Sequence, residues 1–344
     1  MKPNWWQIVG MVGLTFLSSV VVCCAQKPYR FSKEILVGGE GGYDDLSVDV
    51  AARRLYVTHA ASVVVIDLDK ETVVGEIADM PGVHGFAIAP ELGRGFSSNG
   101  RENKVSIVDL RTLKTLSKMD TGENPDAIVY EPTHQEVYAF NGHGNSATVI
   151  DAKTGKLVTT IMLPGKPEFA AVDSKADRVY CNLEDKSAVA AIDATTHRVV
   201  NTWPIAPGAE PSGIAIDPAH RRLFSGCHNK MMVMTDDTNG KVVATMPIGD
   251  HVDGGAFDPA TQLAFSSCGD GTVTIAHEDT PNKLTVVQVL RTEPGARTMT
   301  LDPQTHRIYL PCARFEPQPP PVPGAPRQHP KIIAGTFKVL VYGQ

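Results

Sequence analysis

The chain has 344 residues, 42% of them hydrophobic, with a formal net charge of −6 at pH 7. A mildly acidic protein lacks the excess of lysine and arginine that drives nonspecific binding to nucleic acid or to anionic membranes. Nucleic acid is therefore not an expected partner, and the length is sufficient to bury a substantial core.

The first 25 residues differ from the rest of the chain. Lys2 is their only charged side chain, Ile8–Val22 carries no charge, and the small residues Cys23-Cys24-Ala25 follow. This pattern predicts a secretory signal peptide, residues 1–25, and a secreted or periplasmic mature chain, residues 26–344. A membrane anchor is the alternative, but the run is shorter than the roughly 20 residues that span a bilayer. A lipoprotein signal is less well supported, because Val22 and Cys23 are poor residues before an acylated cysteine. No transmembrane segment is expected in the mature chain.

A unit of strand, turn and strand then recurs about every 42 residues. The turns that mark the unit occur at Asp49, Ala89, Glu131, Asp173, Asp217, Asp258 and Asp302. The unit has no helix-length apolar stripe, so it corresponds to a four-stranded blade and not to a helical repeat. Seven units predict an all-β, seven-bladed β-propeller that forms one domain.

The third unit shows the pattern clearly. Its expected strands are Ala127–Glu131, Glu136–Asn141, Ala147–Asp151 and Lys156–Met162. They alternate polar and apolar residues and are rich in β-branched side chains, as strands are. The recurrent acids, for example in Asp217-Pro218, stand at the first position of tight turns. We interpret these carboxylates as turn formers and not as catalytic groups.

The last unit lacks an outer strand. It contains Thr298–Asp302, Arg307–Pro311 and Phe337–Tyr342, while Lys33–Val37 precedes the first unit as an outer strand would. We therefore expect the N-terminal strand to complete the last blade and to remove the open edge of the ring. The proline-rich insertion, residues 316–330, predicts a polyproline-like loop in this blade. It acts either as a spacer or flap, or as a cover for the channel or a docking segment.

Four cysteines follow the predicted cleavage site: Cys181, Cys227, Cys268 and Cys312. An even number allows disulfides in a secreted protein. The last three, however, occupy equivalent positions in neighbouring blades, farther apart than the roughly 4.4–6.8 Å between Cα atoms that a disulfide needs. We expect buried free thiols, with a bridge between displaced loops as the alternative.

Four strings carry a family resemblance: Arg54–Thr58, Val105–Asp109, Ala147–Gly155 and Gly213–Pro218. They resemble the YVTN repeat of the YncE-like β-propeller family, and the resemblance covers residues 33–344. The motifs are structural, so they imply the fold far more strongly than the function. The resemblance links the chain to secreted or periplasmic proteins, surface-layer proteins and a proposed DNA-binding protein, and more remotely to lactonases and the haem-binding domain of nitrite reductases.

The loops that enter the first strand and that join strands two and three share one face of a propeller, which usually forms the ligand mouth. The residues five positions before the turns are Asp44, His84, Asp126, Glu168, Ser212, Asp253 and Arg297. Second loops add further polar side chains, including His59 and His143. The predicted ligand-binding residues are Asp44, His59, His84, Asp126, His143, Glu168, Asp253 and Arg297.

No cofactor is predicted, but a divalent metal remains open at Asp44, His84, Asp126, Glu168 and Asp253. Oxygen ligands alone suit Ca²⁺ or Mg²⁺, and added histidines favour a transition metal. The alternative is that these acids only form a solvated lining. No catalytic residue is predicted, because the sequence contains neither H-E-x-x-H, nor C-x-x-C-H, nor G-x-S-x-G.

These observations favour a non-catalytic binding scaffold that presents loops and a polar channel mouth to a protein or small ligand. A metal-assisted, lactonase-like hydrolase with its site at the mouth is one alternative. A structural protein of the envelope or surface layer is another. We expect a monomer.

Overall fold

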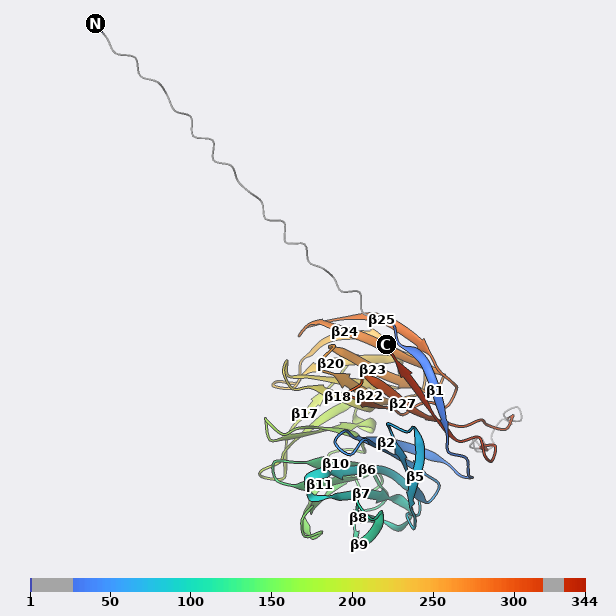
Figure 1. Cartoon of the computed structure of the whole chain (residues 1–344). Coiled ribbons are helices and arrows are strands. Elements are labelled where there is room, and N and C mark those ends of the chain that lie inside the picture. The colour runs from blue at the N-terminus through green and yellow to red at the C-terminus, as the bar shows by residue number, and fades with distance from the viewer. Residues whose placement is uncertain (2–26, 318–330) are drawn as a thin grey trace, which may run out of the picture.

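The computed structural model describes Met1, residues 27–317 and residues 331–344 of the protein. Seven four-stranded antiparallel sheets form a ring in these residues, which confirms the seven-bladed propeller (Figure 1). Residues 2–26, with nearly all of the predicted signal peptide, and residues 318–330, with most of the proline-rich insertion, lie outside the described part of the chain. The ends of that insertion are held together at blade 7, where Phe315 bridges to Ile332.

Each blade is built from four strands that are consecutive in sequence, except the last. Blade 1 contains β2 (Tyr43–Asp49), β3 (Arg54–His59), β4 (Ser62–Asp67) and β5 (Thr72–Ile77). Blade 2 contains β6 (Val83–Ala89), β7 (Arg94–Asn99), β8 (Lys104–Asp109) and β9 (Lys114–Asp120). Blade 3 contains β10 (Pro125–Glu131), β11 (Glu136–Asn141), β12 (Ser146–Asp151) and β13 (Leu157–Met162).

The second half of the ring repeats this order. Blade 4 contains β14 (Pro167–Asp173), β15 (Arg178–Leu183), β16 (Ala188–Asp193) and β17 (Arg198–Pro204). Blade 5 contains β18 (Pro211–Asp217), β19 (Arg222–Cys227), β20 (Met231–Asp236) and β21 (Val242–Pro247). Blade 6 contains β22 (Val252–Asp258), β23 (Leu263–Cys268), β24 (Thr272–Thr280) and β25 (Lys283–Arg291). Blade 7 contains β26 (Thr300–Asp302), β27 (Arg307–Cys312), β28 (Lys338–Gly343) and β1 (Arg30–Leu36). Short 3₁₀ turns follow β6, β7 and β15, at Pro90–Leu92, Gly100–Glu102 and Glu184–Lys186.

The core lies between the blades. The second and third strands are almost wholly buried, whereas outer strands such as β13 expose most of their residues. One apolar cluster joins Phe140 and Val149 of blade 3 to Val179 and Ile192 of blade 4. Sheets that pack face to face in this way exclude water from both surfaces, which is the main stabilising contribution to the ring.

The turn after each inner strand has a positive φ at the same position in all seven blades. Except in blade 2, where Ala89 ends the strand, the terminal acid accepts backbone N–H groups two or three residues later, as Asp217 Oδ1 does from Ala219 at 2.9 Å. Four residues after each marker, the backbone has a positive φ, at Arg53, Gly93, Gln135, Asp177, Arg221, Gln262 and His306. The carboxylates predicted as turn formers therefore stabilise a turn that reverses the chain within a few residues.

The N-terminal strand closes the ring, as the sequence predicts. β1 pairs antiparallel with β28, from Arg30 opposite Gly343 to Leu36 opposite Lys338. Figure 1 shows β1, in blue, beside the strands of the C-terminal end. The strand is longer than the expected Lys33–Val37. Tyr29, just before it, is buried and donates its hydroxyl hydrogen bond to the carbonyl of His306 at 2.7 Å.

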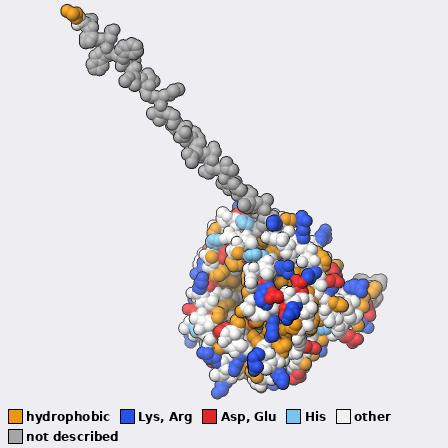
Figure 2. Space-filling model, in the orientation of Figure 1, with side chains coloured by type: hydrophobic (Ala, Val, Ile, Leu, Met, Phe, Trp, Pro, Cys, Tyr) orange, Lys and Arg blue, Asp and Glu red, His pale blue; other side chains and the backbone are white. Residues whose placement is uncertain are grey.

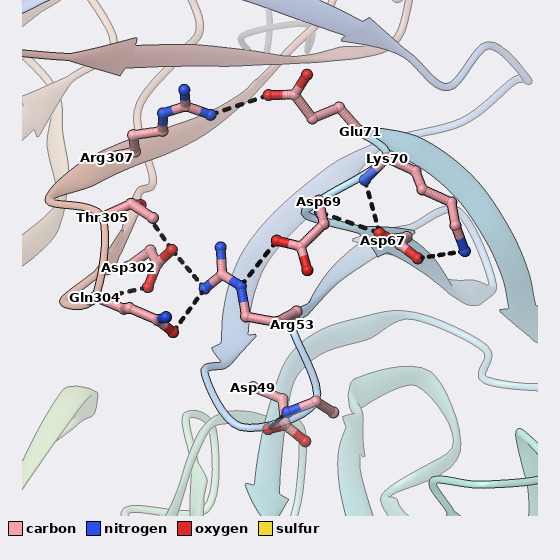
Figure 3. A network of polar contacts seen from close by, with 11 residues as sticks. Asp49, Arg53, Asp67, Asp69, Lys70, Glu71, Asp302, Gln304, Thr305 and Arg307 are labelled. Carbon is pink, nitrogen blue, oxygen red and sulfur yellow. Dashed lines mark hydrogen bonds and ion pairs between the residues drawn. The ribbon is translucent and has the colours of Figure 1, made fainter.

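Ion pairs also cross the boundary between blade 7 and blade 1. Figure 3 shows Arg53 between Asp69 and Asp302. Its Nη1 lies 2.8 Å from Asp302 Oδ2 and its Nε lies 3.1 Å from Asp69 Oδ1. Arg307 Nη1 also lies 3.0 Å from Glu71 Oε1. The first and last blades are therefore joined by strand pairing and by charge.

The four cysteines of the propeller, Cys181, Cys227, Cys268 and Cys312, are buried and free, which confirms that expectation. The last three end β19, β23 and β27, which are equivalent strands. Burial raises the pKa of the Cys227 thiol to about 12.

The face of the molecule in Figure 2 intersperses acidic and basic side chains and carries no broad area of one sign. Among the described residues, no helix is long and apolar enough to span a membrane.

Candidate ligand site at the channel mouth

A break in strand register positions the residues of the predicted mouth. Asp44, His84, Asp126, Glu168, Ser212 and Asp253 are each the second residue of an inner strand. In all six strands the pairing with the second strand shifts at this residue, for example between Tyr43 and Leu46 in β2. Such a β-bulge redirects a side chain that regular alternation would place elsewhere. Arg297 precedes the shorter inner strand β26.

Six of these seven side chains form a continuous chain of contacts around the mouth. His84 Nδ1 lies 2.7 Å from Asp44 Oδ2 and 3.6 Å from Asp126 Oδ1. On the other side of Asp44, Arg297 Nη2 lies 3.1 Å from Asp44 Oδ1 and Arg297 Nε lies 2.9 Å from Asp253 Oδ2. Ser212 extends the chain by donating its hydroxyl hydrogen bond to Asp253 Oδ1 at 2.8 Å.

Glu168 has a different set of partners. Its Oε1 lies 2.7 Å from Lys166 Nζ, and the same ammonium group contacts Glu184. The charge of Lys166 is thus shared between two carboxylates.

Partly buried acids in close proximity alter one another's protonation. Burial raises the pKa of Asp126 to about 6, with the charges of Asp44 and Asp253 adding to the rise and that of His84 opposing it. Burial raises the pKa of Glu168 to about 8, although its bond to Lys166 opposes the rise. These shifts reflect mainly the removal of the carboxylates from water, to which neighbouring acids add.

The pKa of His84 is also raised, but here burial and the neighbouring acids act in opposite directions. Burial alone would lower its pKa, but the hydrogen bond to Asp44 and the charge of Asp126 outweigh burial and raise it to about 9. The imidazole therefore carries a proton at neutral pH and supplies positive charge to the two carboxylates beside it.

Sequence reasoning missed Asp45. Burial and the neighbouring Asp44, Asp253 and Asp126 charges raise the pKa of its carboxyl to about 8, against a lowering backbone hydrogen bond from Leu46. Consecutive residues of a regular strand face opposite sides, so Asp44 and Asp45 are not expected at one site. The bulge in β2 removes that alternation. The two consecutive aspartates, Asp44-Asp45, were the sequence feature that could have pointed to Asp45 as a mouth residue.

His59 and His143 lie outside the chain of contacts. His59 is buried, and its ring stacks on Phe337 with centroids 4.3 Å apart. A Cβ on Gly39 would come within 2.8 Å of His59 Cε1, so a glycine covers the ring. His59 thus packs against blade 7. His143 is exposed at the rim, and its Nδ1 lies 4.0 Å from Glu123 Oε1.

Three of the five predicted metal ligands come together. Candidate ligand atoms of Asp44, His84 and Asp126 all lie within 4.8 Å of one another. Two carboxylates and one imidazole form a donor set that a divalent transition ion accepts. Glu168 and Asp253 stand beside this group and are paired with Lys166 and Arg297.

No protein-family model matches the chain, and the comparison with curated proteins gave no match. The propeller is shown by its seven sheets. The narrower likeness to YVTN repeats rests on the quoted motifs.

Two surface pockets lie at blade boundaries and not at the mouth. One, of about 400 Å³, includes Arg178, Arg221 and Asp237 between blades 4 and 5. The other, of about 510 Å³, includes Arg53 and Arg307 between blades 7 and 1. The arginines occupy equivalent positions and are paired with acids, for instance Arg221 Nε with Asp237 Oδ1 at 2.7 Å. We interpret both pockets as ionic seams between blades.

Proposed function

We propose that the protein is a secreted or periplasmic, non-catalytic propeller scaffold whose channel mouth binds a small cationic ligand. A divalent metal ion matches the site best, with Asp44, His84 and Asp126 as its ligands. The observation that supports this proposal is the convergence of these three side chains within 4.8 Å in a mouth whose acids have raised pKa values. A ligand with positive charge would reduce the repulsion among these carboxylates.

The donor set narrows the choice of ion. Ca²⁺ and Mg²⁺ prefer oxygen ligands, whereas an imidazole nitrogen favours ions such as Mn²⁺ or Zn²⁺. Because the three ligands come from the inner strands of consecutive blades, β2, β6 and β10, the closed ring holds them in place before the ion arrives. Binding then requires displacement of a proton from His84 and little movement of the backbone.

To test this proposal, the metal content and the thermal unfolding of the purified protein are measured before and after treatment with a chelator. Added Mn²⁺ or Zn²⁺ at 100 times its dissociation constant should stabilise the chelated protein by about 2.7 kcal/mol. Asp126→Asn should abolish this stabilisation at the mouth. Glu123→Gln is the matched control, because Glu123 is an exposed acid at the rim with a side chain 69% accessible. If the metal response of Asp126→Asn equals that of the unchanged chain, the mouth does not bind the ion.

An organic amine is the other ligand with this chemistry. Methylammonium and spermidine, titrated into the chelated protein, distinguish it from a metal. The mouth would be assigned to an organic cation if an amine, but no metal ion, stabilised the protein and if Asp126→Asn removed that stabilisation.

Metal-assisted hydrolysis is a second candidate because the raised pKa of Glu168, about 8, gives the mouth an acid–base group near neutral pH. An ion with three protein ligands retains positions for water, and a neighbouring carboxyl can transfer a proton. Lactone hydrolysis that requires added metal and disappears in both Asp126→Asn and Glu168→Gln would favour this function over binding alone.

A further inference from the structure

A second charged cluster lies away from the mouth, and the repeat of the blades reveals it. In blades 1 to 6, one residue at the end of the third strand donates its backbone N–H to the carbonyl of the positive-φ turn residue, as Leu68 does to Arg53. In blades 1 to 5 it directly follows the strand, whereas in blade 6 it is Glu278, within the longer strand β24, which donates to Gln262. This position is buried in every case. The side chains at it are Leu68, Leu110, Ala152, Ala194, Asp237 and Glu278. Four blades therefore bury an apolar side chain where blades 5 and 6 bury an acid.

The two acids differ in their partners. Asp237 of blade 5 is paired with Arg221, the turn residue of its own blade, at 2.7 Å. The equivalent turn residue of blade 6 is Gln262, which has no charge. Glu278 is fully buried, and among the described residues neither of its carboxylate oxygens accepts a hydrogen bond. A buried acid without a donor is costly, so its retention calls for a partner.

Glu278 faces two titratable groups of blade 5. His220 Nδ1 lies 3.4 Å from Glu278 Oε1 and 2.7 Å from Asp217 Oδ2. Asp217 is 1% exposed, and its other oxygen, Oδ1, accepts the backbone N–H of Ala219. Candidate ligand atoms of all three side chains lie within 4.8 Å of one another. The unsatisfied carboxylate of Glu278, one buried oxygen of Asp217 and an imidazole nitrogen thus lie around one small volume.

We propose that Asp217, His220 and Glu278 form a metal site at the boundary of blades 5 and 6, which binds a divalent transition ion such as Zn²⁺. Zinc bonds of about 2.1 Å in a tetrahedron place ligand atoms about 3.4 Å apart. The His220–Glu278 separation already has this value, and the His220–Asp217 pair needs to open by less than 1 Å. The side chain of His220 is 32% exposed, so the ion reaches the buried carboxylates from the surface.

The alternative partner is a proton shared between the two carboxyls. Burial and the neighbouring Asp217 raise the pKa of Glu278 to about 7, with His220 opposing the rise. A shared proton would join one oxygen of Glu278 to Asp217 and needs no imidazole. An ion neutralises both acids and uses the nitrogen of His220 as its third ligand. The two states are distinguished by whether zinc binds.

Isothermal titration of chelator-treated protein with Zn²⁺ tests the site, with thermal unfolding recorded with and without zinc. Glu278→Gln, which keeps the size of the side chain, should bind one equivalent of zinc fewer per chain than the unchanged protein. His220→Asn, a change at a partly exposed side chain, should give the same loss and guards against misfolding in the first variant. Asp237→Asn is the matched control at the equivalent position of blade 5 and should keep the full stoichiometry.

The result separates this site from the mouth. The Asp126→Asn protein should still bind the one equivalent of zinc that the Glu278→Gln protein loses, whether or not the mouth binds an ion. Zinc binding by Glu278→Gln with the stoichiometry and affinity of the unchanged protein would overturn the proposal. The proposal would also be overturned if none of the zinc bound by the unchanged protein depended on Glu278.

Discussion

Replacement of Arg53 with glutamine should weaken the boundary between blade 7 and blade 1. Arg53 contacts Asp302, whose side chain is completely buried, while its own side chain is 19% exposed. Glutamine is a close match for the backbone, because Gln262 occupies the equivalent turn of blade 6 with φ 55° and Arg53 has φ 53°. The substitution therefore removes the charge without adding strain.

The expected loss of stability depends on the hydrogen bonds that Asp302 keeps in the variant. Removal of one partner of a buried ion pair generally costs about 3–5 kcal/mol, because the remaining charge is left uncompensated. Asp302 would still accept hydrogen bonds from Thr305 Oγ1 at 2.7 Å and from the backbone N–H of Gln304 at 3.0 Å. Because of these contacts, we expect a loss just below that range, about 2–3 kcal/mol.

The loss should depend on pH. Burial would raise the pKa of Asp302, but hydrogen bonds from Thr305 and Arg53 outweigh it and lower that pKa. A carboxyl with a lowered pKa contributes stability above its unfolded value of about 3.9 and loses it as the pH falls through the folded value. The difference between Arg53→Gln and the unchanged protein should therefore be full at pH 7 and should shrink below about pH 4.

Urea unfolding followed by circular dichroism at pH 7 and pH 3 measures this difference. Arg198→Gln is the control, because Arg198 is exposed at the start of β17 and such surface changes stay within about 0.5 kcal/mol. An Arg53→Gln protein as stable as this control at pH 7 would refute the reasoning. A loss that is equal at both pH values would show that charge is not its cause.

Two further predictions concern the closure of the ring and the cysteines. Tyr29→Ala should lower the free energy of unfolding by about 3–5 kcal/mol, because the buried ring packs edge-on against Phe265. Tyr29→Phe, which removes only the hydroxyl donor, should cost about 1 kcal/mol in the same urea assay, and equal losses would argue against packing. Cys181, Cys227, Cys268 and Cys312 are buried, so a thiol reagent at pH 7 should modify them only after denaturation. Rapid labelling of the native protein would contradict their burial.

The fold could be predicted from the sequence because the repeat supplies its own alignment. Acids such as Asp217 and Asp258 recur at one place in the unit, and their turns have one conformation. Lys33–Val37 could be assigned to the last blade since a four-stranded unit lacked its outer strand. The inner strand of blade 7 was less predictable. It begins at Thr300, two residues later than expected, because Arg297 and Thr298 belong to the loop at the mouth.

The mouth was predictable in position but not in detail. Counting back from the turns found Asp44, His84 and Asp126, since equivalent residues lie at equivalent places in a ring. The contacts among them depend on β-bulges, which shift the pairing without any proline or glycine common to all the strands. His59 also belongs to a mouth loop in sequence, yet its ring packs on Phe337, a residue far away in the chain.

The cluster at blades 5 and 6 shows why position in one blade is not sufficient. Asp217 forms a turn, as the sequence indicates, and His220 follows it as a polar turn residue. Their relation to Glu278 emerges only when the third strands are aligned between blades and four of six equivalent side chains prove apolar. A buried acid at a position that otherwise holds leucine or alanine loses packing and gains a charge that must be compensated.

Asp237 and Glu278 share this departure from the repeat, but only Asp237 has an arginine beside it. A structural ion pair therefore explains Asp237, whereas Glu278 of blade 6 lies beside a second buried acid and an imidazole, Asp217 and His220 of blade 5. Equivalent positions in different blades can thus be compared directly. The contrast between these two positions, and not the acidity of the cluster, is the reason to expect a bound cation at Glu278.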